Sequence, residues 1–181
     1  MRIAFLEHGL TYHEVMEDVF HPSATLLEHN PLGRVPTVVL KNGLRLCESQ
    51  VILTAFQKTL TSSLEELSVS GLMLGLCDKI VERLLESQRP SETRDPEIFT
   101  DFERLLPPTL ERTEAFVLAH SPLLGSGTLT QAAVDVGVTL AYLNLRVGTH
   151  WHASYPGCKN FLDGLETRAS FEKTLPPPPG H

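Results

Sequence analysis

The clearest pattern near the N-terminus is a pair of short apolar runs separated by a turn. Thr37 to Leu40 is rich in β-branched residues, and Leu44 to Cys47 forms the second run. The dipeptide Asn42-Gly43 between them is typical of a type I′ turn, which needs two positive φ angles. The pattern therefore predicts a β-hairpin.

After this hairpin the apolar period lengthens to three or four residues. Ser49 stands at an expected helix N-cap. The apolar positions that follow it are Val51, Ile52, Ala55, Phe56 and Leu60. This spacing predicts a helix, so the second strand runs directly into a helix N-terminus.

From about Thr61 onward, helical spacing dominates and strand-like runs vanish. One long amphipathic helix is marked by Leu67, Leu74, Ile80, Val81, Leu84 and Leu85. We expect a second helix to open at Pro107-Pro108, because proline suits only a helix's first turn, and to close at 125–127. The sequence therefore predicts a helical second domain.

Two further helices are predicted near the C-terminus. The first begins at Thr130 and continues through Val134, Val138, Ala141 and Leu145, and the second begins at Pro156 and includes Phe161, Leu162 and Leu165. We expect an α/β domain over residues 1–60, an all-helical domain over 61–175 and a loose tail over 176–181.

Composition narrows the choice of partners. The formal charge is −7, with 15 Lys and Arg scattered among 22 Asp and Glu, which argues against nucleic acid. No apolar window approaches the roughly 20 residues of a membrane-spanning helix, and we expect a cytoplasmic protein. Cys47, Cys77 and Cys158 have no metal or disulfide spacing, and His150-Trp151-His152 lacks further donors nearby, so no metal is expected.

Residues 30–52 read NPLGRVPTVVLKNGLRLCESQVI. This stretch resembles the glutathione-binding half of the cytosolic glutathione S-transferases, whose motif runs Asn-Pro-x-Gly-x-Val-Pro, then a hairpin, then Glu-Ser-x-x-Ile. The matching positions are Asn30, Pro31, Gly33, Val35, Pro36, Glu48, Ser49 and Ile52. The resemblance implies a thioredoxin-like N-terminal domain followed by the family's all-helical C-terminal domain.

The resemblance also implies a glutathione site. In the family the proline at Pro36 is cis, and the residue before it, here Val35, pairs its backbone with the cysteinyl unit of glutathione. Glu48 and Ser49 would hold the γ-glutamyl end, and His21 would lie near the glycyl end.

Elementary electrostatics supports the same assignment. A helix N-terminus offers free N–H groups to a carboxylate beside Ser49, and Glu48 offers a counter-charge to an ammonium group. On the six residues CESQVI alone, a plain helix cap at Ser49 and a solvated acid at Glu48 are the favoured interpretation, and only the upstream motif reverses this preference. His21 is equally a surface histidine that opens a His-Pro turn.

The chain begins inside the family's first helix. Arg2, Ile3, Ala4, Glu7, Gly9 and Leu10 fit its last turns, with Gly9 as a left-handed residue after the helix. The family's first strand would lie between a strand near Tyr12–Val19 and the strand at Thr37–Leu40. That strand and the Ser, Tyr or Cys that activates the glutathione sulfur are absent from the 181 residues, and we expect the true start to lie upstream of Met1.

Three functions remain open at this point. The first is a homodimeric transferase that conjugates glutathione, as cosubstrate, to a small apolar electrophile. The second is a non-catalytic binding or interaction protein of the same fold. The third is a Cys-type, glutathione-dependent thiol transferase or isomerase.

Overall fold

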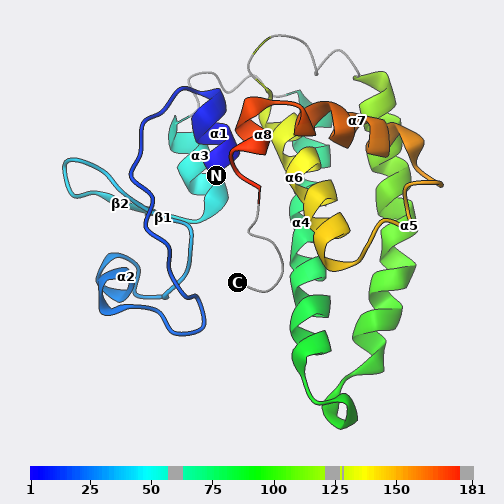
Figure 1. Cartoon of the computed structure of the whole chain (residues 1–181), viewed down its shortest axis with the longest axis horizontal. Helices are drawn as coiled ribbons and strands as arrows, with labels where there is room; N and C mark the ends of the chain where they lie inside the picture. Colours follow the sequence, from blue (N-terminus) through cyan, green and yellow to red (C-terminus); the bar gives the residue numbers. More distant parts are fainter. Residues whose placement is uncertain (57–62, 121–126, 128, 176–181) are drawn as a thin grey trace. The chain divides into compact units, whose positions relative to one another are not determined.

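The computed structural model of the chain describes residues 1–56, 63–120, 127 and 129–175. It divides into two compact units, Met1–Thr61 and Ser62–His181 (Figure 1). The first unit contains the β-hairpin and short helices, and the second is helical. This confirms the expected α/β plus all-α fold. The predicted tail over 176–181 and residues 125–126 of the predicted helix end lie outside the described residues.

The first helix, α1 (Arg2–Glu7), ends in a glycine-dependent motif. Gly9 has φ 63°, which confirms the expected left-handed residue. Gly9 N–H donates to Leu6 O at 3.1 Å, and Leu10 N–H donates to Phe5 O at 2.9 Å. These two bonds form the Schellman arrangement, in which a residue without Cβ satisfies the last carbonyls of the helix.

The strand expected at Tyr12–Val19 is not formed. This segment is irregular, and the next element is a helix, α2 (Ala24–His29), capped by Ser23, whose hydroxyl accepts from Leu26 N–H at 3.0 Å. A strand is stable only with a ladder partner, and Tyr12–Val19 has none among the described residues. The apolar residues of this segment therefore do not adopt the predicted conformation.

The predicted hairpin is confirmed, but its turn differs from the prediction. Strands β1 (Thr37–Val39) and β2 (Arg45–Cys47) pair antiparallel, and Val38 lies opposite Leu46. Only Gly43, with φ 82°, has a positive φ in the loop, so the turn is not type I′. Gly43 N–H donates to Leu40 O at 2.8 Å, as in a three-residue loop closed by a left-handed glycine. Helix α3 (Ser49–Phe56) follows directly.

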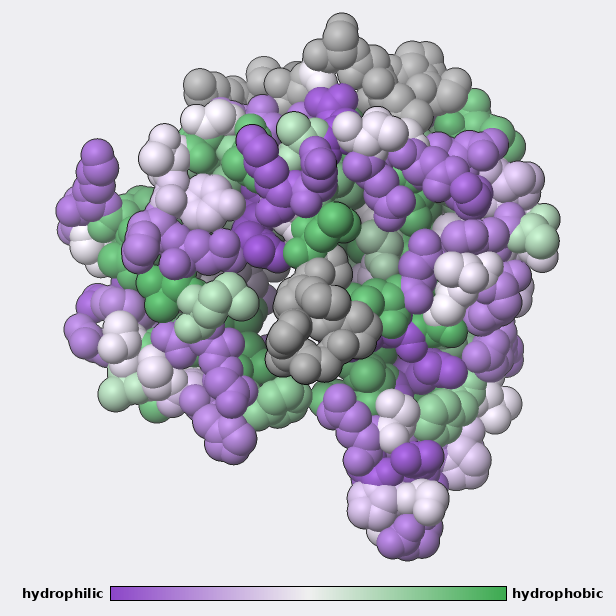
Figure 2. Space-filling model, in the orientation of Figure 1, coloured by the Kyte–Doolittle hydropathy of each residue, from purple (hydrophilic) through white to green (hydrophobic). Residues whose placement is uncertain are grey.

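Three long helices build the second unit, α4 (Leu64–Gln88), α5 (Pro96–Ala119) and α6 (Gln131–Arg146). In Figure 1 α4 and α5 run side by side, joined by the short 3-10 helix η1 (Ser91–Thr93), and α6 packs against α4. Figure 2 shows hydrophilic residues over the η1 end. No helix among the described residues is long and apolar enough to cross a membrane.

The apolar face predicted for α4 is largely wrong. Ile80 is buried, but Leu67, Val81 and Leu85 are exposed. The buried apolar residues are Val69, Met73, Leu76 and Ile80, spaced four, three and four apart. Leucines surround this helix on several sides, so periodicity alone does not select the face that meets α5 and α6.

The predicted start of α5 at Pro107-Pro108 is also wrong, because both prolines lie inside the helix. The helix begins at Pro96, and the Asp95 carboxylate accepts from Glu97 N–H at 2.9 Å. An interior proline costs about 3 kcal/mol. Phe102, Leu106, Leu110 and Phe116 are buried on both sides of the prolines. This packing keeps the helix continuous.

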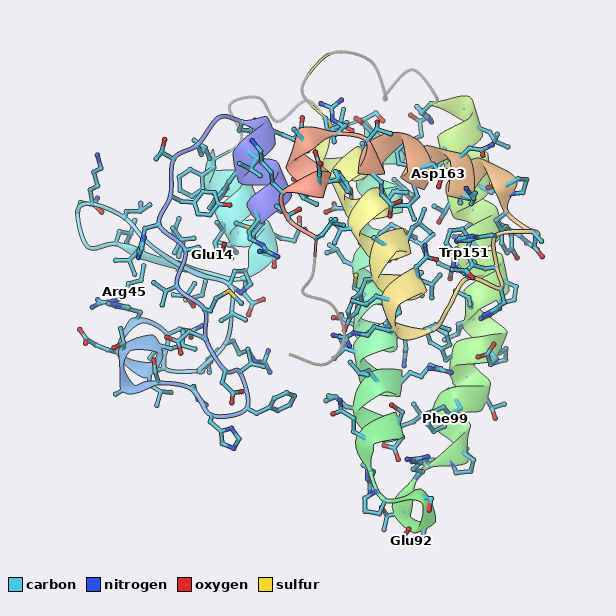
Figure 3. The ribbon with its side chains drawn as sticks, in the orientation of Figure 1. Glu14, Arg45, Glu92, Phe99, Trp151 and Asp163 are labelled. Carbon is cyan, nitrogen blue, oxygen red and sulfur yellow. The ribbon has the colours of Figure 1, made fainter. Side chains whose placement is uncertain are left out.

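Figure 3 shows Phe99 of α5, whose ring centroid lies 5.6 Å from the guanidinium carbon of Arg83 on α4.

Helix α6 starts as predicted, with the Thr130 hydroxyl accepting from Ala133 N–H at 3.2 Å. Val134 is buried, whereas Val138 and Leu145 are exposed. At Gly137 an added Cβ would overlap Leu165 and lie 2.9 Å from Phe171 Cζ. Glycine at this position therefore allows α7 (Pro156–Glu166) and α8 (Ala169–Glu172) to pack closely on α6.

Helix α7 begins at Pro156, as predicted, but its N-terminus is capped from another helix. Tyr155 provides no side-chain cap. Instead the Glu114 carboxylate of α5 accepts from Gly157 N–H at 2.7 Å and from Cys158 N–H at 2.6 Å. A charged acceptor on two free N–H groups of a helix start is a strong arrangement.

We expect Glu114→Ala to lower the free energy of unfolding by about 1–3 kcal/mol, because two N–H groups in a part-buried position lose their acceptor. Urea denaturation of the full chain measures this change. Glu111→Ala, an exposed acid one turn earlier on the same helix, is the control and should stay within about 0.5 kcal/mol of the wild type. Equal effects at both positions would contradict the role given to Glu114.

Candidate functional site

The register of the hairpin brings the two halves of the predicted site to one end of the sheet. Thr37 lies opposite Cys47. Pro36 immediately precedes Thr37 and Glu48 immediately follows Cys47, so the two halves of the motif flank the same end of the pair. Residues separated by more than ten positions in the chain therefore lie at one hairpin end.

The backbone at Val35 is available for an additional interaction. The Val35–Pro36 peptide bond is cis, as the resemblance implied. Val35 is 49% exposed and has no hydrogen-bond partner among the described residues. A backbone segment with free N–H and C=O groups can pair with a peptide as an added strand would.

Glu48 has an uncommon backbone conformation. Its φ is 71°, and it is the only non-glycine residue with a positive φ in the described part of the chain. For an L-residue the left-handed region costs about 1–2 kcal/mol. Such conformations often cluster at functional sites. The Glu48 side chain is exposed, and it forms no ion pair with a described residue.

The N-cap predicted at Ser49 is displaced by one residue. Ser49 is the first residue of α3, and Glu48 occupies the cap position, because its carbonyl accepts from Ile52 N–H at 3.0 Å. The left-handed Glu48 makes the turn from β2 into the helix. Ser49 is half-buried and its hydroxyl lies in the first turn, where backbone N–H groups of a helix are free.

In the part of the chain that the structure describes, no hydrogen bond or ion pair joins His21 to these residues. Its side chain is 87% exposed, and Nδ1 lies 2.9 Å from Asp18 Oδ2. This hydrogen bond lowers the pKa of the Asp18 carboxyl below its ordinary value. The neighbouring Pro22 does pack near the motif, since an added Cβ at Gly33 would lie 3.1 Å from Pro22 Cγ. Arg45 lies on the hairpin near α2, with Nε 3.1 Å from His29 Nδ1 (Figure 3).

The three cysteines are free thiols. Cys158 is buried, whereas Cys47 and Cys77 are half-buried. Burial raises the pKa of Cys77 and that of Cys158, which disfavours the reactive thiolate. The described residues contain no cluster of three or more His, Cys, Asp or Glu that could hold a metal ion.

An open groove of about 710 Å³ lies between α4 and α5 in the second unit. Val69, Leu72 and Phe116 are among its apolar lining residues, and Glu65 and Arg112 are among its charged ones. The His120 ring stacks on Phe116 at 4.3 Å. This groove was not expected from the sequence, because exposed leucines on an amphipathic helix are also ordinary surface residues.

The comparisons with known proteins show a family match for the first unit and a similar fold for the whole chain. Residues 1–59 match the family described as glutathione S-transferase, N-terminal domain. The uncharacterized GST-like protein YibF of Escherichia coli (strain K12) is 23% identical, over 98% of this chain and 92% of its own length.

Solved structures of the family are similar over nearly the whole chain. A glutathione transferase family member from Pseudomonas fluorescens Pf-5, with bound glutathione, has a TM-score of 0.83 at 24% identity and covers 98% of this chain and 92% of its own. A glutathione S-transferase from Methylobacterium radiotolerans JCM 2831, in complex with glutathione sulfonate, has a TM-score of 0.80 at 26% identity, covering 97% of this chain and 87% of its own. Residues 1–59 therefore match the glutathione S-transferase N-terminal domain, and the whole chain has the fold of the glutathione S-transferases.

We expect Glu48→Gly to be more stable than Glu48→Ala by up to about 1 kcal/mol, because only glycine adopts φ 71° without strain. At most positions a glycine variant is less stable than the alanine variant, so a more stable Glu48→Gly variant would indicate a left-handed backbone at residue 48. Chemical denaturation of both variants measures it. A more stable alanine variant would contradict the left-handed conformation.

Proposed function

We propose that the chain binds glutathione at the hairpin end formed by Val35, Pro36, Glu48 and Ser49. The observation that carries the proposal is the unpartnered Val35 backbone at the same end of the β1–β2 pair as the exposed Glu48 carboxylate. The ligand found in similar structures supports the choice of glutathione over other peptides.

Each part of the tripeptide has a chemically matched partner in this proposal. The cysteinyl unit is an extended amide that pairs with the Val35 backbone. The γ-glutamyl end carries an ammonium group, which suits the Glu48 carboxylate, and a carboxylate, which suits the free N–H groups beside Ser49. We propose His21 as the partner of the glycyl carboxylate, because the adjacent Pro22 packs near Gly33.

We further propose that the bound glutathione reacts as a thiolate with a small apolar electrophile. The sulfur lone pair forms a bond to an electrophilic carbon. Either a leaving group departs with the electron pair of its bond to that carbon, or the electrons of a π bond of the acceptor move to the neighbouring atom, which is then protonated. The thiol proton passes to solvent or a base. Binding places the sulfur close to the acceptor, so part of the rate comes from proximity. None of the described residues is assigned to activate the thiol, so a non-catalytic binding role and a Cys-type thiol transferase remain the alternatives.

We expect Glu48→Gln to weaken glutathione binding at least tenfold, because a neutral amide cannot compensate the ammonium charge of the ligand. Isothermal titration calorimetry with the full chain measures the affinity. Glu28→Gln, at an exposed acid on α2 of the same unit, is the matched control and should bind as the wild type does. Unchanged affinity in Glu48→Gln would remove Glu48 from the site.

We also propose that the protein is a homodimer that pairs through the groove between α4 and α5. Leu64, at the start of α4, is 84% exposed, and Leu118, near the end of α5, is 63% exposed. Glu65 and Arg112 both line the groove, and neither forms an ion pair with a described residue. In this proposal Glu65 of one copy faces Arg112 of the other, and the two-fold axis repeats the contact, because every contact of an isologous interface occurs twice.

We expect Arg112→Glu to weaken dimerisation at least tenfold, because it places two acids opposite each other. The double variant Glu65→Arg, Arg112→Glu should restore the dimer. Sedimentation equilibrium distinguishes the 20.1 kDa chain from its dimer. Arg104→Glu, an exposed change elsewhere on α5, is the control. A dimer that survives the single swap, or is not rescued by the double swap, would contradict this pairing.

A further inference from the structure

The loop between α2 and β1 contains a hydrogen-bonded cluster around one buried amide. Asn30 is only 3% exposed. Its Oδ1 accepts from Leu32 N–H at 3.1 Å, and its Nδ2 donates to Arg34 O at 2.9 Å and to Thr37 Oγ1 at 3.2 Å. Asn30 therefore joins both sides of the loop that ends at the cis-proline.

The Arg34 carbonyl accepts a second hydrogen bond from this cluster. Thr37 Oγ1 donates to Arg34 O at 2.8 Å, in addition to the bond from Asn30. We call the two side chains together with Arg34 O the carbonyl clamp. Two donors on one oxygen hold the peptide plane between residues 34 and 35 in one orientation.

This orientation determines where the Val35 N–H points. Arg34 C=O and Val35 N–H belong to one planar peptide unit, and in a trans unit they point in opposite directions. The only cis bond among the described residues is the next one, Val35–Pro36. Because the clamp holds Arg34 O towards Asn30, the N–H of Val35 points away from Asn30 and has no partner in the described chain.

We propose that Asn30 and Thr37 are positioning residues of the glutathione site, which aim the Val35 N–H at the ligand without touching it. This inference rests on the proposed function. In the free protein the clamp already fixes the direction of the Val35 N–H, so binding does not have to order this peptide unit. Preorganisation of this kind raises affinity without an additional contact.

Thr37 is the position at which to test the clamp, because Thr37→Val removes the hydroxyl and nearly conserves the side-chain volume. The bond from Asn30 to Arg34 O and the bond from Gly33 N–H to Asn30 O at 2.8 Å remain to close the loop. Thr37→Ser keeps the hydroxyl and is the matched control. Asn30→Ala is less suitable, since it leaves several buried groups unpaired.

Calorimetric titration of the full chain with glutathione is the first measurement. We expect Thr37→Val to weaken binding about three- to tenfold, which corresponds to one net hydrogen bond, and Thr37→Ser to bind within about twofold of the wild type. Amide exchange followed by NMR gives a residue-specific readout. Glutathione should protect the Val35 N–H in the wild type and in Thr37→Ser, and should protect it less in Thr37→Val.

Wild-type affinity in Thr37→Val, or an equal loss in Thr37→Ser, would overturn the positioning role. A wild-type chain that binds no glutathione would overturn the proposed function, and the clamp is then judged in the free protein. There the two Asn30 side-chain amide protons should exchange slowly, and one should exchange at least tenfold faster in Thr37→Val. Rapid exchange of both protons in the wild type would show that the clamp is not formed.

Discussion

The antiparallel register of β1 and β2 is the constraint on which the rest of the candidate site depends. Because Thr37 pairs with Cys47, the loop that ends at Pro36 and the helix that begins at Ser49 lie at the same end of the hairpin. A one-residue slip would turn every side chain of one strand to the other face. Gly43 sets this register, since its left-handed φ closes a three-residue loop rather than a two-residue one.

The candidate site in the first unit contains two features that would be unfavourable in isolation. Glu48 is left-handed, and Asn30 is buried with its polar atoms satisfied inside the loop. Such features persist only where the surrounding structure determines them. The second unit uses the same principle for stability, because Glu114 of α5 caps the start of α7, forty-three positions along the chain. Hydrogen bonds within one loop of the first unit, and between distant helices of the second, fix what local preference leaves open.

Much of the architecture could be predicted from local chemistry. The hairpin, the left-handed Gly9, the starts of α6 and α7 and the all-helical second unit follow from turn residues, caps and hydrophobic period. The strand at Tyr12–Val19 was wrong because strand propensity gives no strand without a partner. The start of α5 was wrong because packing on both sides of Pro107 and Pro108 outweighs their local cost. The cap at Ser49 was off by one residue because Glu48 adopts a conformation that its residue type rarely takes.

The order of motif residues from Asn30 to Ile52 was sufficient to predict the fold and to propose Val35, Pro36, Glu48 and Ser49 as site residues, because these positions follow from residue type and spacing. How these residues are held in place depends on the folded chain. The free Val35 backbone and the carbonyl clamp at Arg34 arise from the folded loop between α2 and β1, and the buried face of α4 arises from its packing with α5 and α6. Residue type limits which hydrogen bonds a side chain can form, but only the fold determines which partner is within reach.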